Sequence, residues 1–125
     1  MTGAVIGLDH VQVAAPPGCE EDARRFYGEL LGLEELDKPP TLAVRGGVWF
    51  RVGEHQLHVG VADGFTPAAK AHPALRVASP AELERLADRL GEHGVHVRWA
   101  DPGEIPGVSR LFLADPWGNR VELVA

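Results

Sequence analysis

The segments LDHVQV (8–13) and KAHPALRV (70–77) decide the fold, because the second reproduces the pattern of the first about half a chain later. Each contains a histidine, His10 or His72, and then alternating residues that predict a β-strand. The two histidines are 62 residues apart, which indicates an internal repeat.

A second pair of segments, HQLHVGV (55–61) and NRVELV (119–124), ends each copy of the repeat. His58 and Glu122 stand at matching places in them, 64 residues apart. One helix-like stretch and further strand-like sequence lie between the first and last segment of each copy. The sequence therefore predicts two βαβββ modules, each with one potential metal ligand on its first strand and one on its last. Three imidazoles and a carboxylate at repeat-related positions suggest one site on a pseudo-twofold axis.

We expect residues 1–125 to form a single α+β domain made of two modules, at about 1–62 and 70–125, with a curled mixed sheet around a polar cavity. Apolar stripes with i, i+3, i+4, i+7 spacing predict one helix in each module. The expected strands are 6–14, 33–36, 42–44, 48–52, 55–61, 72–77, 95–99, 110–114 and 119–125.

Strand alternation separates an apolar face from a polar face in the first and last strand of each module. The apolar faces must pack on the two helices, so the polar faces should line the cavity. The polar faces carry His10 and Gln12, Gln56 and His58, His72 and Arg76, and Arg120 and Glu122. All four potential ligands thus share the polar side.

Composition narrows the function. The net charge of −6, without a cluster of Lys or Arg, argues against nucleic acid or an anionic membrane as a partner. No apolar run is long enough for a membrane helix, and the N-terminal sequence does not resemble a signal peptide. The single cysteine, Cys19, favours a cytoplasmic location and is expected to be an inert thiol.

These segments resemble the vicinal oxygen chelate superfamily, which includes glyoxalase I, bleomycin-resistance proteins, fosfomycin-resistance enzymes and extradiol dioxygenases. The resemblance extends over nearly the whole chain, in order. It rests on LDHVQVAAP, RRFYGELLGLEEL, WFRVGEHQLHVGV, HPALRVASPAELERLADRLGEHGV and LFLADPWGNRVELV.

The resemblance implies a divalent metal ion (zinc, nickel, cobalt, manganese or iron) bound by His10, His58, His72 and Glu122. Glyoxalase I-like members usually have glutamate at the position of His58, so only Glu122 remains as a carboxylate general base. An extradiol dioxygenase would use the set His10, His72 and Glu122. The leading hypothesis is a metal-dependent lyase or isomerase that chelates neighbouring oxygens of a small substrate; the alternative is a drug- or metabolite-binding protein without catalysis.

Four further residues are candidates for substrate binding: Trp49, Arg51, Arg76 and Phe112. An aromatic wall with guanidinium groups could select a flat or anionic substrate. Trp49 and Phe112 could equally fill a core or a dimer contact. Arg76 and Arg120 could bind a carboxylate or hold the metal ligands in place.

We also expect a homodimer, because modules of this kind leave sheet edges that need covering. The resemblance allows two arrangements. Modules paired within one chain would unite all four ligands, whereas exchanged modules would divide them into His10 with His58 and His72 with Glu122. The sequence does not choose between the two.

Overall fold

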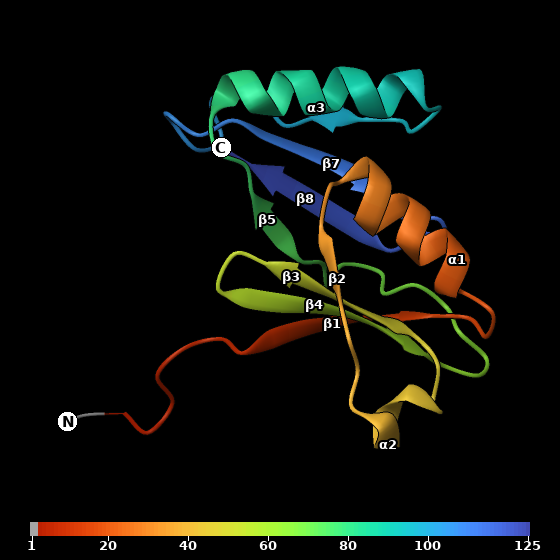
Figure 1. Ribbon diagram of the computed structural model, residues 1–125. Helices are drawn as coiled ribbons and strands as arrows, with labels where there is room; N and C mark the ends of the chain where they lie inside the picture. Colours follow the sequence, from red (N-terminus) through yellow and green to blue (C-terminus); the bar gives the residue numbers. More distant parts are fainter. Residues whose placement is uncertain (1–2) are drawn as a thin grey trace.

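The computed structural model describes residues 3–125, so the first two residues of the predicted first module lie outside the described part. The first half of the chain forms a mixed sheet with the strand order β1-β4-β3-β2 and short helices (Figure 1). Its elements are β1 (His10–Ala15), α1 (Glu20–Ala23), the π-helical η1 (Arg24–Leu30), β2 (Glu34–Leu36), α2 (Pro40–Ala43), β3 (Val48–Val52) and β4 (His55–Val61).

The second half has the same topology, with the strand order β5-β8-β7-β6. In both sheets the first strand pairs in parallel with the last, and the remaining pairs are antiparallel. The elements are β5 (Ala74–Arg76), α3 (Pro80–Glu92), β6 (Arg98–Trp99), β7 (Arg110–Ala114) and β8 (Arg120–Val124). The predicted α+β class and the βαβββ repeat are therefore confirmed.

The helices begin and end where local chemistry places them. The Ser79 side chain accepts a hydrogen bond from the Glu82 backbone N–H, and Pro80 occupies the first turn, so the capping-box residues Ser79 and Glu82 mark the start of α3. Gly32 follows η1 with a φ of 77°, a left-handed conformation that only glycine adopts readily. Cys19 precedes α1 and is buried. Its burial, more than the nearby Glu20 carboxylate, raises the pKa of the thiol to about 11.

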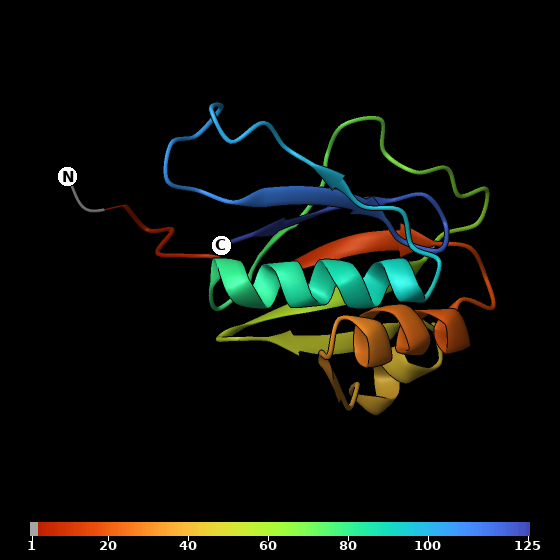
Figure 2. The same ribbon diagram turned by 90° about the horizontal axis from the view of Figure 1, so that it is seen from above.

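One hydrophobic core joins both halves, built from the apolar sheet faces and the apolar stripes of the helices. α3 runs beside α1 and η1 (Figure 2), and Arg89 donates a hydrogen bond to the Glu29 carbonyl. The Tyr27 hydroxyl donates to Asp115 at 2.8 Å, which ties η1 to the turn between β7 and β8. Because the helices cover the apolar faces, the polar face of each sheet stays open.

The fold differs from the expectations in detail. The predicted mixed sheet consists of two four-stranded sheets, one in each half of the chain. Residues 42–44 do not form a strand, because Pro39 and Pro40 open a helical turn there instead. The strand expected at 95–99 contains only Arg98 and Trp99.

The first strand starts at His10 rather than at residue 6. The preceding segment extends away from the body of the protein (Figures 1 and 2). It exposes large apolar side chains, with Val5 at 90%, Ile6 at 97% and Leu8 at 69% exposure. Elsewhere, no helix in the described part of the chain has the length and apolar character needed to cross a membrane.

Candidate functional site

Three stacked aromatic rings lie on the open face of the first sheet; we call His10, Trp49 and His58 the first-sheet cluster. The His58 ring is 3.9 Å from the Trp49 ring and 4.2 Å from the His10 ring, measured between centroids, with interplanar angles of 3° and 17°. Strand register places these side chains on one face: Trp49 on β3 is the direct neighbour of His58, and His10 lies two residues before Gln12, the neighbour of His58 on β1. His58 is 5% exposed, so the stack shields it from water.

Hydrogen bonds leave one ring nitrogen of each histidine in this cluster available. His10 Nδ1 lies 2.8 Å from Asp9 Oδ1, which leaves Nε2. His58 Nε2 donates to Gln56 Oε1 at 2.8 Å, which leaves Nδ1. The pKa of His58 is lowered mainly by its burial and secondly by the neighbouring His10, so the neutral form is favoured. Neutral imidazoles with one nitrogen held by a second partner are typical metal ligands.

The second sheet carries a different group on its open face, the second-sheet cluster of His72, Arg110, Phe112 and Glu122. The Glu122 carboxylate contacts two partners: Oε1 is 3.0 Å from His72 Nε2, and Oε2 accepts from Arg110 Nε at 3.0 Å. The Phe112 ring stands edge-on to the His72 ring, with 5.8 Å between centroids. Ala74 and Phe112 flank Glu122 in register, so the strand pairing places these side chains on one face.

The proton on His72 can be assigned from its partners. Nδ1 lies 2.9 Å from the Lys70 carbonyl, which can only accept, so Nδ1 donates. A neutral His72 then turns the lone pair of Nε2 toward a carboxylate oxygen of Glu122. Two acceptors at 3.0 Å need a positive charge between or on them, either an imidazolium proton or a bound cation. The 3.0 Å distance is that of a hydrogen bond, and imidazole nitrogen and carboxylate oxygen are also ligand types that zinc accepts.

Arg110 controls the charge of Glu122. Burial alone would raise the pKa of this carboxyl, but the hydrogen bond from Arg110, and then that from His72, outweigh it and hold the pKa below its usual value. Arg110 also contacts Glu104 at 3.0 Å. The sequence offered Arg76 and Arg120 either to bind a carboxylate or to hold the metal ligands; in the structure, Arg110 contacts Glu122. The alternation of Arg110 with Phe112 in RLFLA carried the missed signal.

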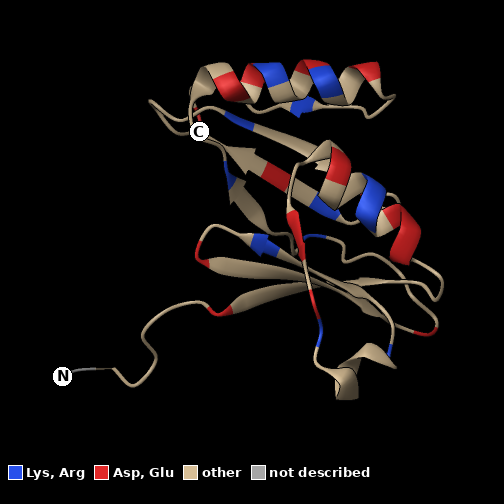
Figure 3. Ribbon diagram, in the orientation of Figure 1, with Lys and Arg blue, Asp and Glu red and all other residues tan. Residues whose placement is uncertain are grey.

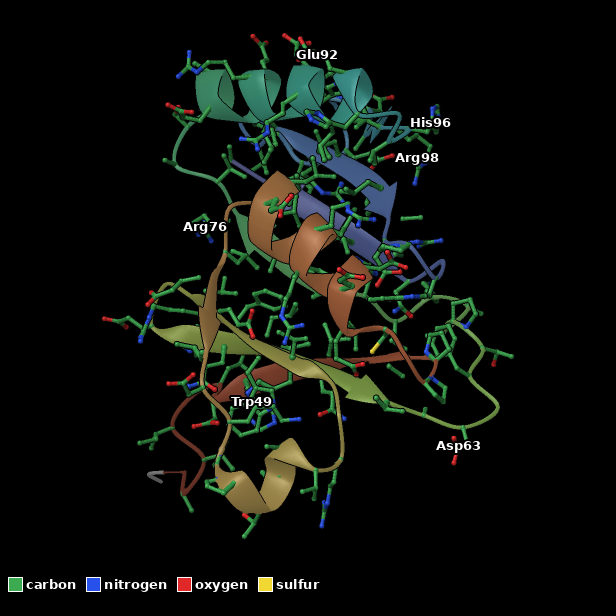
Figure 4. The ribbon with its side chains drawn as sticks, turned by 45° about the vertical axis from the view of Figure 1, so that its right-hand side comes forward. Trp49, Asp63, Arg76, Glu92, His96 and Arg98 are labelled. Carbon is green, nitrogen blue, oxygen red and sulfur yellow. The ribbon has the colours of Figure 1, made fainter. Side chains whose placement is uncertain are left out.

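The structure brings the four predicted ligands together only as two pairs, His10 with His58 and His72 with Glu122. Between residues 3 and 125, one chain contains no group of three or more His, Cys, Asp or Glu side chains that could hold a metal. Figure 4 labels Trp49 on the first sheet and Arg98 on the second, well apart from each other. Each sheet therefore presents half of the expected donor set, and we call each of these pairs a half-site.

The other predicted site residues also lie on these open faces. Trp49 and Phe112 belong to the two clusters. Arg51 pairs with Glu34 at 3.1 Å, and Arg76 is exposed on β5. Basic side chains gather on the second sheet (Figure 3), where Arg76, Arg98, Arg110 and Arg120 lie on four different strands.

Comparisons with known proteins agree with this architecture. The sequence profile of the Glyoxalase/Bleomycin resistance protein/Dioxygenase superfamily matches residues 7–123. The chain belongs to this superfamily. A comparison with curated protein sequences found no match.

Solved structures of similar fold include a glyoxalase family protein from Bacillus anthracis, which is 45% identical with a TM-score of 0.90, over 99% of this chain and 98% of that one. A lactoylglutathione lyase from Agrobacterium tumefaciens is 21% identical with a TM-score of 0.73, over 98% and 95% of the two chains. The fosfomycin resistance protein FosX from Listeria monocytogenes is 17% identical with a TM-score of 0.74, over 97% and 93%. The last two structures are only 21% and 17% identical to this chain, so they show that the fold is shared and nothing more.

Proposed function

We propose that this protein is a glyoxalase-like metalloenzyme whose divalent metal site is assembled from two copies of the chain. His10 and His58 of one copy would join the partner subunit's His72 and Glu122. The observation that carries the proposal is the division of the donors: each pair is formed on an open sheet face, and neither pair alone makes a metal site.

The donor set fits a borderline divalent ion such as zinc, nickel, cobalt, manganese or iron, all of which accept imidazole and carboxylate ligands. His10 and His72 are oriented alike, since each has Nδ1 held by an oxygen acceptor and Nε2 left for an ion. Supporting partners of this kind fix the ring orientation of metal-binding histidines. His72 Nε2 and Glu122 Oε1 already lie 3.0 Å apart, so one ion could contact both atoms in place of the proton between them.

A second copy is supported by the surfaces that one chain leaves open. β1 pairs only with β4, and β5 pairs only with β8, so each sheet ends in an edge strand beside its proposed ligands. The exposed Val5, Ile6 and Leu8 directly precede His10, and a partner chain could cover them. A homodimer formed through these parts would build two equivalent sites.

A bound divalent ion would polarise neighbouring oxygens of a small substrate as a Lewis acid. We assign proton transfer to the Glu122 carboxylate, because Arg110 donates a hydrogen bond to it and keeps it ionised. Trp49 and Phe112 would form the aromatic walls of the site. The reaction class we favour is that of a lyase or isomerase. The ring stack of the first-sheet cluster also suits a ligand-binding protein without catalysis, which is the second candidate.

Subunit mixing tests the shared site. His10→Ala and His72→Ala are prepared separately, and each homodimer should lack zinc, because both of its sites miss one ligand. After the two are unfolded and refolded together at equal concentration, mixed dimers contain one site with all four ligands. Random pairing should restore about a quarter of the wild-type zinc content.

The controls for this experiment use the same chains. Each variant is also refolded alone, and circular dichroism verifies that it regains its fold. No restored zinc in a mixture shown to contain mixed dimers would contradict a shared site. Wild-type protein that binds no divalent ion would instead favour the ligand-binding alternative.

A further inference from the structure

An arginine-rich cavity opens beside the second-sheet cluster. Its volume is about 660 Å³, within the range of pockets that bind small molecules. Arg98, Phe112 and Arg120 line it from the second sheet, and Phe26 and Leu30 contribute apolar surface from η1. The cavity thus combines a cationic side with an apolar side.

The guanidinium groups gather around one ring. The Arg98 Cζ atom is 4.7 Å from the Phe112 ring centroid, that of Arg110 is 5.4 Å away, and that of Arg120 is 6.0 Å away. Cation–π attraction holds guanidinium groups at such distances while their N–H groups can still donate elsewhere. Phe112 therefore gathers like charges that would otherwise repel one another.

These arginines differ in their ion pairs. Arg110 is already neutralised by Glu104 and Glu122. Within residues 3–125, Arg98 and Arg120 form no ion pair with a carboxylate.

The cavity also contains two acidic residues, and both already have partners. Asp22 pairs with Arg25. Asp115 accepts hydrogen bonds from Tyr27, from the Asn119 side chain and from backbone N–H groups of its own turn. Two positive charges in the cavity thus remain without a counter-ion from residues 3–125.

We propose that this cavity binds the carboxylate of an organic anion, which Arg98 and Arg120 hold while its apolar body contacts Phe26 and Leu30. Guanidinium and carboxylate groups match in geometry and form strong charge-assisted hydrogen bonds. Phe112 connects the cavity to the half-site, because its ring also contacts His72. The inference rests on the proposed function in one respect: the bound anion is taken to be the substrate.

The test uses 3-phenylpropionate and its neutral amide, which share one shape and differ in charge. Both are titrated calorimetrically into the full-length protein, without metal and with stoichiometric zinc. We expect the carboxylate to bind at least about tenfold more tightly than the amide in the metal-free protein, since hydrogen bonds to charged groups contribute about 1.5–3 kcal/mol. Arg98→Gln and Arg120→Gln should each weaken carboxylate binding about tenfold and leave amide binding unchanged.

Arg45→Gln is the matched control. Arg45 is exposed in the other module and lies outside the cavity, and its replacement removes the same charge. Carboxylate binding should not change in this variant. Equal binding of acid and amide, or an equal loss in Arg45→Gln, would overturn the inference.

Zinc binding by the same proteins separates this inference from the proposed function. Arg98→Gln and Arg120→Gln should keep wild-type zinc affinity. Protein that binds zinc but not 3-phenylpropionate would overturn the anion cavity and leave the metal site in place. Protein that binds the carboxylate through both arginines but never binds zinc would support the cavity and overturn the metalloenzyme.

Discussion

The open faces of the two sheets occupy matching places in the repeat, yet they hold their proposed ligands by different means. On the first sheet, His58 lies in a stack of rings, and its polar partner is the neutral Gln56. On the second sheet, Glu122 lies in a network of charges with His72 and Arg110. The proposed ligands therefore lie at matching positions in the repeat, but the residues that contact them differ between the two sheets.

This difference has a physical consequence for each half-site. A buried carboxylate needs hydrogen bonds and a compensating charge, which Arg110 supplies. A buried neutral imidazole needs a well-packed neighbour and one hydrogen-bond acceptor. For His58, the Trp49 ring is that neighbour and Gln56 is that acceptor. The second-sheet cluster should therefore be more sensitive to the loss of a single charged group than the first.

The largest effect should come from Glu122→Gln. This change keeps the size of the side chain but removes the only carboxylate of the proposed donor set. We expect zinc affinity, measured by competition with a chromogenic chelator, to fall by more than about a hundredfold, beyond the ~10–100-fold typical of residues that support a ligand. Glu104→Gln is the matched control, because Glu104 also contacts Arg110. Equal losses in the two variants would show that Glu122 is not a ligand.

The next effect concerns the arginine behind that carboxylate. Arg110→Gln should weaken zinc binding by about 10–100-fold, because Glu122 loses its orientation and its compensating charge. The variant should also be less stable to urea, by roughly 1–3 kcal/mol. Arg85→Gln, at an exposed ion pair on α3, serves as the control and should change neither quantity. A zinc affinity unchanged in Arg110→Gln would remove Arg110 from the site.

Much of the fold could be predicted because it depends on local and periodic signals. The capping box at Ser79, the glycine after the first helix and the alternation in HQLHVGV each fix one element independently of the others. The helical turn at residues 40–43 was missed because two prolines before apolar residues suit both a strand break and a helix start. The start of β1 was missed because apolar residues 5–8 continue the pattern without being paired.

The candidate site was only partly predictable for a related reason. The repeat and the resemblance pointed to His10, His58, His72 and Glu122 as proposed metal ligands. The alternation of side chains along each strand then placed all four on the polar faces. The repeat does not encode which sheets face each other, since that depends on how the helices pack across the whole chain. The sequence did not single out Arg110 as a partner of Glu122, because the two lie on neighbouring strands, β7 and β8, whose pairing is not visible in the spacing of either strand.

A smaller effect is expected on the first sheet, where Trp49→Leu removes one side of the ring stack. Zinc affinity should fall about threefold to tenfold, since an aromatic pair contributes about 0.5–1.5 kcal/mol and here orients His58. Trp99→Leu is the control, because Trp99 is exposed on β6 and lies outside both clusters. A loss as large as that of Glu122→Gln would mean that the two faces do not differ as described.

The smallest effect should come from Asp9→Asn, and it tests the contrast between the two supporting groups most directly. Asp9 contacts His10 Nδ1 at 2.8 Å, but its side chain is 95% exposed, so water can replace it and salt can screen it. We expect zinc affinity to change by less than about twofold at low ionic strength and not at all in 0.5 M salt. The loss in Arg110→Gln should persist at both ionic strengths, because Arg110 and Glu122 are only 16% and 11% exposed. A tenfold, salt-independent loss in Asp9→Asn would mean that the assembled dimer buries Asp9, so that both half-sites depend on a protected charged partner.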